Sequence, residues 1–406
     1  MVTRLERGRP LLGPALSLIH AGHAPTRSAL TVGLGVTRAT AGAVAGELQS
    51  LGLIRVDAAP GGPADAPGRP SHRLTVDPGG PVALAAQIHP DGFGVALVGL
   101  GGRVVDQMAT TRNVPSDDPE RTASQVASAA ARLLRRTGRR CAGAGLAVPS
   151  AVARPDGTAV SPLYVDWPTG TPIREIFARQ VARAGITGPG GSALACCVDN
   201  DINLAALAEH RHGAGRGADH LLVVATGHRG VGGALVVGGA LYTGSTGLGM
   251  EAGHVSVDQA GRRCPCGSRG CLNVETDALS FMEAAGRVPS LETTVLEQAT
   301  GILRTEYADN PEVRAAAAWL TERLGLGLAG LVNVLNPDRI LLGGLHRWLL
   351  EADPARLRAA VGELSPWGRG AGVPLLPCVL DDGSLVGAAE LAWQPVLDNP
   401  AVLNAG

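Results

Sequence analysis

The chain has 406 residues, a net charge of −1, and 45% hydrophobic against 17% charged residues. This composition excludes a disordered chain and a coiled coil, and the length allows two or three domains. All 35 basic residues are arginine, which also excludes a lysine-containing phosphate loop and a Schiff-base lysine.

The sequence has no uncharged apolar stretch of about 18 residues and no signal-peptide profile at its start. We therefore expect a cytoplasmic protein that has no membrane partner. The seven cysteines are an odd number, and three of them fall between Cys264 and Cys271. That spacing argues against a disulfide framework and favours a metal site.

The first 79 residues predict three short helices followed by a β-hairpin. Apolar residues between Leu11 and Ile19 predict the first helix, which should end near Gly22. Thr26 and Thr37 are expected to cap the second and third helices, the third running to about Ser50. Strands are expected at 53–56 and 72–76, on either side of a segment rich in glycine and proline.

Helix, turn, helix and β-wing is an arrangement that places the third helix in the major groove of DNA. Residues 1–80 hold eight arginines and five acidic residues, so this segment suits an anionic partner. The residues expected to contact DNA lie at the start of the third helix, on the wing and on the return strand: Thr37, Arg38, Thr40, Arg69 and Arg73. The alternative is a protein-docking or dimerisation module.

From about residue 80 the pattern changes to alternating strands and helices. Strands are predicted at 82–88, 95–100, 103–105 and 142–148, with a helix at 119–136. Residues 92–101 match 230–239 in their glycine, alanine and aliphatic positions. The match predicts two similar α/β lobes with a ligand cleft between them, although chance matching of common residues is the alternative.

Three cysteines and a histidine form the strongest chemical signal in the chain. Cys264, Cys266 and Cys271 lie in a short glycine-containing segment, and His254 lies ten residues upstream of the first of them. Three thiolates and one imidazole make a closed tetrahedral set that is typical of structural zinc. A group of free thiols is the alternative.

Residues 249–254 (GMEAGH) followed by 264–271 (CPCGSRGC) resemble the signature of the ROK family of repressors, open reading frames and sugar kinases. Residues 198–203 (VDNDIN) resemble a second hallmark of that family, and the glycine turns at 343–344 and 387–389 resemble later ones. The likeness covers about residues 80–395. The segment before it resembles the DNA-binding part of the family's N-acetylglucosamine and xylose repressors.

This resemblance implies an α/β fold, in which an N-terminal winged helix-turn-helix precedes a two-lobed actin-like (ribonuclease H-like) ATPase fold. Residues 1–79 would bind DNA and residues 80–402 would form the sugar-sensing body. The first lobe would span about 80–195 plus a C-terminal segment, and the second about 196–382.

The resemblance also assigns roles to individual residues. Asn200, Asp201 and Glu251 would bind sugar hydroxyls, and Asp201 stands at the position of the catalytic base in kinase members. His254 would ligate zinc beside the sugar. Carboxylates and an amide suit a polyol, since they accept and donate paired hydrogen bonds. For Asn200 and Asp201 the alternative is a helix cap without a ligand.

Three features depart from the family pattern. The kinase phosphate loop falls on 87–91 (QIHPD) and is not preserved, and an asparagine expected before Trp167 is replaced by the segment 161–164 (SPLY). Leu272-Asn273 stands where the family has Leu-Glu, which leaves Glu275 as the substitute sugar ligand.

The sequence therefore predicts a sugar-responsive DNA-binding transcriptional regulator rather than an enzyme, and we expect a repressor of carbohydrate-metabolism genes. Its partners would be a double-stranded DNA operator, a sugar or sugar-derivative effector, and a second copy in a homodimer or dimer of dimers. Structural zinc would be its cofactor. A ligand-independent DNA-binding regulator and an ATP-dependent sugar kinase are the alternatives.

Overall fold

The computed structural model describes residues 9–57, 71–111, 118–366 and 372–404. The described N-terminal residues form what we call the head: three helices and a two-stranded antiparallel sheet. These are α1 (Arg9–His20), α2 (Arg27–Leu34), α3 (Arg38–Ser50), β1 (Ile54–Asp57) and β2 (Arg73–Val76). Thr26 and Thr37 cap α2 and α3 through their side-chain oxygens, as the sequence predicts.

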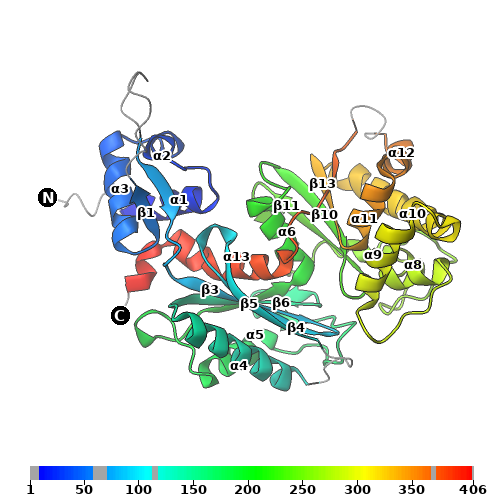
Figure 1. The fold of residues 1–406 in the computed structure, drawn as a ribbon, viewed down its shortest axis with the longest axis horizontal. Helices are drawn as coiled ribbons and strands as arrows, with labels where there is room; N and C mark the ends of the chain where they lie inside the picture. Colours follow the sequence, from blue (N-terminus) through cyan, green and yellow to red (C-terminus); the bar gives the residue numbers. More distant parts are fainter. Residues whose placement is uncertain (1–8, 58–70, 112–117, 367–371, 405–406) are drawn as a thin grey trace.

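The first lobe is built on a five-stranded sheet in the order β5-β4-β3-β6-β9. Two helices cover one face, and the C-terminal helix α13 (Gly383–Asp398) covers the other; Figure 1 shows this layering. The remaining elements are β3 (Val82–His89), β4 (Gly92–Val98), β5 (Val104–Thr111), β6 (Cys141–Val148), β9 (Cys196–Asn200), α4 (Pro119–Thr137), α5 (Ile173–Arg183) and the small hairpin β7 (Val152–Ala153) and β8 (Thr158–Ala159).

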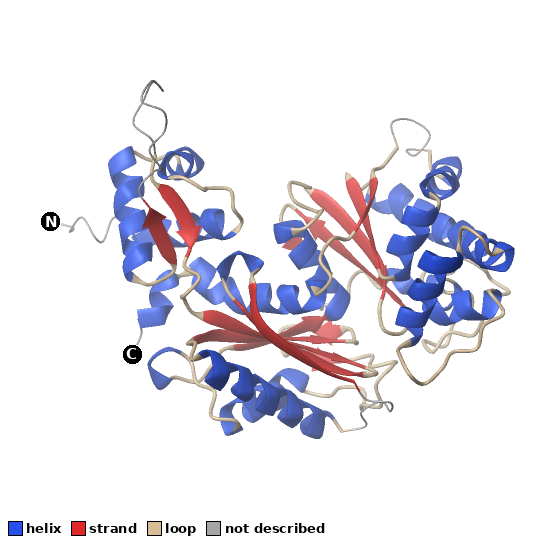
Figure 2. Ribbon diagram, viewed as in Figure 1, coloured by secondary structure: helices blue, strands red, loops and turns tan. Residues whose placement is uncertain are grey.

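The second lobe has a sheet of the same topology, in the order β12-β11-β10-β13-β14. Its strands are β10 (His220–Thr226), β11 (Val231–Val237), β12 (Ala240–Leu241), β13 (Arg339–Gly343) and β14 (Leu375–Pro377). Most of its helices cover the outer face (Figure 2): α7 (Leu272–Glu275), α8 (Ala278–Ala284), α9 (Val295–Glu306), α10 (Pro311–Leu335), α11 (Leu345–Ala352) and α12 (Pro354–Leu364).

The matching segments found in the sequence occupy the same place in the two sheets. β4 and β11 are each second from an edge, and each pairs with the strand before it in an antiparallel register. The repeat in the sequence therefore reflects a repeat of topology.

Three predicted boundaries are wrong. The strand expected at 103–105 is longer, because β5 extends to Thr111. The strand expected at 95–100 ends at Val98, because Leu100 lies in a 3₁₀ turn in which Gly101 has φ +75°. The sequence predicts that the second lobe begins at about residue 196, but β9 (196–200) pairs with β6 in the first sheet. The chain crosses from one lobe to the other only after Asn200, through α6 (Asp201–His212).

The head is joined to the first lobe by a shared apolar core. Leu12 and Leu16 of α1 belong to the same buried cluster as Trp393 and Val396 of α13. No helix in the described ranges is long and apolar enough to cross a membrane. The fold thus places a small N-terminal unit against one end of a two-lobed body.

Candidate functional site

A pocket of about 80 Å³ lies between the two lobes. The first lobe contributes the ends of β6 and β9 and the loop 161–164, and the second lobe contributes the β10–β11 turn and the loop before the cysteines. The polar residues that line the pocket are Ser150, Ser161, Tyr164, Asn200, Asp201, Arg229, Glu251, His254 and Asn273. Asn200, Asp201, Glu251 and His254 are therefore brought together, as the sequence predicts.

The junction of β9 and α6 fixes Asn200 and Asp201. The Asn200 side chain accepts hydrogen bonds from the backbone N–H groups of Ile202 and Asn203 at 2.9 and 3.2 Å, so it caps α6. Its Nδ2 donates to the Ser150 carbonyl at 3.2 Å. Burial raises the pKa of Asp201 to about 6. The cap expected as the alternative for Asn200 thus exists within the pocket.

Asp199, the residue before Asn200, holds this junction from behind. It is buried and accepts from Arg154 Nη2 at 2.5 Å and from Asn203 Nδ2 at 3.0 Å. Arg154 belongs to the β7–β8 hairpin, and its backbone N–H donates to the Thr246 carbonyl of the second lobe. The orientation of the pocket residues is therefore fixed by contacts from both lobes.

His254 and the three cysteines converge beside the pocket. Their potential ligand atoms lie within 4.8 Å of one another, with 3.6 Å between Cys264 Sγ and His254 Nδ1 and 3.8 Å between Cys266 Sγ and Cys271 Sγ. A tetrahedral zinc would hold two sulfurs about 3.8 Å apart and a sulfur and a nitrogen about 3.6 Å apart, given its usual bond lengths. The donor set and spacing fit zinc.

The imidazole of His254 connects this cluster to the pocket. Its Nδ1 faces the sulfurs, whereas its Nε2 lies 3.8 Å from Glu251 Oε2. Burial lowers the pKa of His254, which favours the neutral ring that a metal requires. A bound zinc would be held by His254, Cys264, Cys266 and Cys271, and would stiffen the loop that carries Glu251.

Glu275 is not a pocket residue, contrary to the sequence prediction. Its Oε1 accepts from the backbone N–H of Arg262 at 2.7 Å and its Oε2 lies 3.5 Å from Arg323 Nε, so it supports the loop before the cysteines. Residues two apart on a helix point about 200° apart. Within the short helix α7, Asn273 therefore faces the pocket and Glu275 faces away.

The sequence prediction missed five polar residues of the pocket: Ser150, Ser161, Arg229, Asn273 and Tyr164, of which the last two are hydrogen-bonded to each other. Asn273 Oδ1 accepts from the Val231 N–H at 2.8 Å, and its Nδ2 donates to the Tyr164 hydroxyl and lies 3.6 Å from Cys264 Sγ. Asn273 and Tyr164 both stand where the chain departs from the family pattern. Those departures were the signal that could have found them.

Where kinases of the family carry the phosphate loop, the turns of the two sheets approach each other. The His89 and His228 rings stack with centroids 3.7 Å apart. Asp91 lies 3.6 Å from His228 Nδ1 and 3.7 Å from Arg229 Nη2, and these neighbours lower the pKa of that carboxyl. Side chains, rather than open backbone N–H groups, fill this part of the cleft.

The residues predicted to contact DNA lie on the head, except for Arg69, which is outside the described residues. Thr37 and Arg38 are exposed, Thr40 is partly buried, and Arg73 is exposed at the start of β2. The Thr37 hydroxyl accepts from the Thr40 N–H at 3.2 Å, so part of its hydrogen-bonding capacity serves the cap. Helix α3 lies on the outer side of the head (Figure 1).

The family model that describes the ROK family matches residues 91–394. The chain belongs to the ROK family. Similar proteins of this family include a glucokinase of Thermotoga maritima, 28% identical over 49% of this chain and 62% of that protein, and the DNA-binding transcriptional dual regulator NagC of Escherichia coli, 28% identical over 50% of this chain and 51% of that protein. The match thus spans about half the length of these curated relatives.

Solved ROK structures share the fold. A ROK family transcriptional regulator, a homologue of the E. coli MLC protein, superposes with a TM-score of 0.73 at 20% identity, over 97% of both chains. A ROK glucokinase of Streptomyces griseus, solved with glucose and AMPPNP, superposes with a TM-score of 0.65 at 23% identity, over 77% of this chain and 99% of its own. ROK kinases and ROK regulators are thus both among the similar proteins.

Proposed function

We propose that this ROK protein is a sugar-responsive DNA-binding transcriptional regulator, a repressor of carbohydrate-metabolism genes. The observation that carries the proposal is the head: three capped helices and a two-stranded sheet precede the ROK body. The regulator structure aligns with 97% of the chain, whereas the glucokinase leaves about a quarter of it unmatched. Residues 1–79 would bind DNA and 80–402 would sense the effector.

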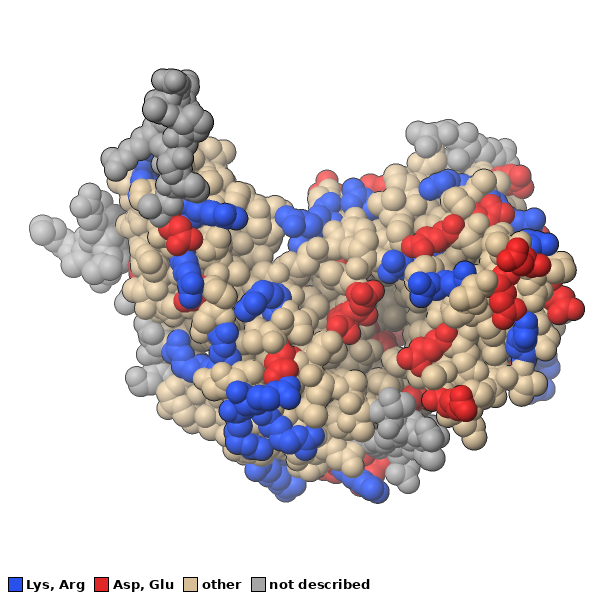
Figure 3. Space-filling model, in the orientation of Figure 1, with Lys and Arg blue, Asp and Glu red and all other residues tan. Residues whose placement is uncertain are grey.

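The distribution of charge supports DNA as the partner. Arginine side chains stand on the head and on the first lobe next to it, while acidic side chains are more frequent on the second lobe (Figure 3). The side chain of Arg38, at the start of α3, makes no hydrogen bond or ion pair with the described residues. It is therefore available for a base edge, and Arg73 for a phosphate.

The pocket supports a sugar as the effector. Asn200, Asp201 and Glu251 offer an amide and two carboxylates to the hydroxyls of a polyol. In a homodimer, two heads would engage half-sites about 34–36 Å apart. An effector that binds one arrangement of the lobes more tightly would shift the population toward that arrangement, and the spacing of the heads would change with it. The change in the free energy between the two arrangements cannot exceed the difference in the effector's binding free energy for them.

A regulator that no longer responds to an effector is the second candidate. The specific observation is the Asn273–Tyr164 hydrogen bond, which ties together two side chains that line the pocket and occupies their hydrogen-bonding groups. Sugar kinase activity is disfavoured because the stacked rings of His89 and His228, with the Asp91 carboxylate beside them, stand at the position of the phosphate loop.

Selection of binding sites from random double-stranded DNA with the intact protein tests the proposal. We expect one inverted-repeat sequence to be enriched. A thermal-shift screen with glucose, N-acetylglucosamine, xylose and mannose then separates the two candidates, because a ligand that binds only the folded state raises its stability. Failure to enrich any sequence would refute the DNA-binding function.

A further inference from the structure

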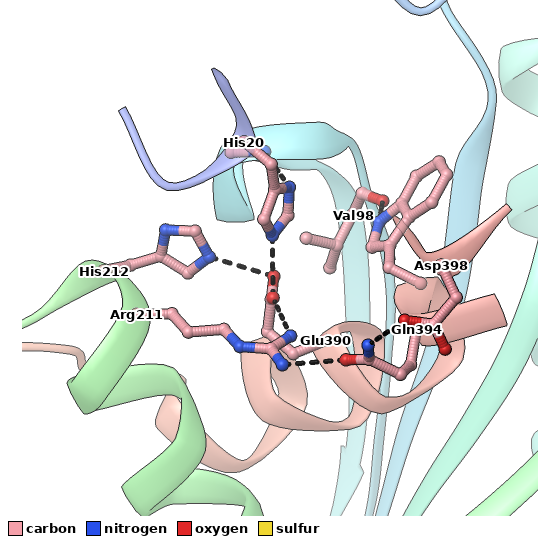
Figure 4. A network of polar contacts seen from close by, with 9 residues as sticks. His20, Val98, Arg211, His212, Glu390, Gln394 and Asp398 are labelled. Atoms are coloured by element: carbon pink, nitrogen blue, oxygen red, sulfur yellow. Dashed lines mark hydrogen bonds and ion pairs between the residues drawn. The ribbon is translucent and has the colours of Figure 1, made fainter. Parts of the chain in front are cut away.

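The carboxylate of Glu390 lies where three helices from distant parts of the chain meet. Glu390 belongs to α13 and is fully buried. Its Oε2 accepts hydrogen bonds from His20 Nε2 at 2.7 Å and from Arg211 Nη1 at 2.8 Å, and its Oε1 accepts from His212 Nε2 at 2.9 Å (Figure 4). His20 ends α1 of the head, and Arg211 and His212 end α6.

The protonation of His20 follows from its other neighbour. The backbone N–H of Gly101 donates to His20 Nδ1 at 2.9 Å, so Nδ1 carries no proton and Nε2 donates to Glu390. Two histidines and a carboxylate could hold a metal, but a protonated Nε2 has no lone pair for one, and Arg211 already neutralises the carboxylate. The cluster is therefore a hydrogen-bonded joint between helices.

The carboxyl group of Glu390 is ionised in the folded protein. Burial alone would raise the pKa of Glu390, but its interactions with His20 and His212 outweigh burial and hold the pKa well below its ordinary value. The other polar side chain at the joint is Gln394, which accepts from Arg211 Nη2 at 2.8 Å and donates to Asp398. Glu390 is thus an ionised acceptor whose hydrogen bonds have fixed directions.

The opposite end of α6 lies in the pocket. Helix α6 has 12 residues, so its first residue, Asp201, is roughly 17 Å from the joint. Helix α13 packs closely against it: a Cβ at Gly387 would lie 1.8 Å from the Leu204 carbonyl oxygen, and Ser384 Oγ donates to the Asp201 carbonyl at 3.0 Å. Two helices in such close backbone contact have little room to shift against each other, so a displacement of one is passed to the other.

We propose that the α6–α13 pair transmits changes at the pocket to the head, and that the Glu390–His20 contact is where the head receives them. The inference rests on the proposed function, for which it supplies the route of regulation. The apolar contacts between α1 and α13 hold the head in place but are non-directional. The directional hydrogen bond from His20 to Glu390 fixes the angle at which α1 lies on the body, and hence where α3 is presented.

Amide hydrogen exchange of the intact protein tests this coupling without a sugar or DNA. Asn200→Ala removes the cap at the pocket end of α6, and Glu390→Gln removes the charged acceptor at the joint. We expect Asn200→Ala to speed exchange in peptides covering α1 and Gly101 by about three- to tenfold, although they lie at the far end of α6. In the Glu390→Gln background the same substitution should leave α1 exchange unchanged.

Arg216→Ala is the matched control. Arg216 Nη2 donates to the Ala21 carbonyl at 2.8 Å, so this variant also removes a hydrogen bond between head and body but leaves Glu390 intact. The response of α1 to Asn200→Ala should persist in it. Peptides of α10 report global unfolding and should not change. If Glu390→Gln does not fold, His20→Ala, which removes the head's side of the same contact, replaces it in the same cycle.

Additive effects of Asn200→Ala and Glu390→Gln on α1, or no effect of Asn200→Ala there, would overturn the proposal. Because no DNA is present, this result is separate from the outcome of the binding-site selection. If that selection yields an operator, Glu390→Gln should still bind it, while Asn200→Ala should alter operator affinity only when Glu390 is intact. An equal effect of Asn200→Ala in both backgrounds would contradict the route.

Discussion

Replacing Asp201 by asparagine should make the protein more stable, although Asp201 lies in the candidate sugar pocket. A carboxyl whose pKa rises from 3.8 to about 6 on folding lowers the free energy of unfolding at neutral pH by about 3 kcal/mol. Asp201 is partly exposed to the pocket, so solvent should reduce this cost to about 1–2 kcal/mol. The asparagine Oδ1 can still accept from the Ile202 N–H, as Asp201 does at 2.9 Å.

The way in which the stability difference changes with pH shows whether the raised pKa of Asp201 is its cause. Since the folded-state pKa is raised, the folded protein binds more protons between pH 3.8 and about 6, and the penalty from Asp201 disappears as the pH falls through this range. The advantage of Asp201→Asn should be largest above pH 7, about half as large at pH 5, and about a fifth as large at pH 4.

Urea unfolding followed by tryptophan fluorescence, between about pH 5 and pH 8, measures this difference. Asp199→Asn is the control. Asp199 is the neighbouring carboxylate, and it is paired with Arg154, so its loss should destabilise the protein by about 1–3 kcal/mol. A less stable Asp201→Asn at pH 8, or a difference that does not depend on pH, would refute the reasoning. The expected result would show a carboxylate retained at a cost to stability, as binding residues often are.

Three other outcomes are expected. The purified, reduced protein should carry one zinc per chain, and Cys266→Ser should lose it and unfold at a lower temperature, because structural zinc contributes folding free energy; elemental analysis that finds no metal would overturn this. Arg38→Ala should weaken binding to the selected DNA by about 1–3 kcal/mol and relax its sequence preference, whereas Arg69→Ala should weaken binding to all sequences evenly, as measured by fluorescence anisotropy; unchanged binding by the double variant would exclude this docking. A coupled assay with ATP, magnesium and glucose, N-acetylglucosamine, xylose or mannose should detect no ADP, since phosphoryl transfer depends on charge stabilisation around the phosphates; turnover of about 1 s⁻¹ that is abolished by Asp201→Asn would identify a kinase instead.

The sequence by itself determined the features that depend on neighbouring residues. Thr26 and Thr37 cap the helices that follow them, because a cap satisfies N–H groups only two or three positions away. The convergence of the three cysteines was predictable for the same reason, since their short spacing leaves the chain few other arrangements. The repeat of the two sheets was visible in the sequence because equivalent strands pack in similar surroundings and therefore carry similar residue types.

Only the tertiary structure decided which side chains meet across long separations. The choice between Asn273 and Glu275 depended on which face of a one-turn helix is turned toward the pocket, and that is set by the packing of the second lobe. The contact between His20 and Glu390 joins residues 370 positions apart. No local pattern encodes it, because a buried hydrogen bond of this kind is specified by the docking of α1, α6 and α13, to which each helix contributes only one or two residues.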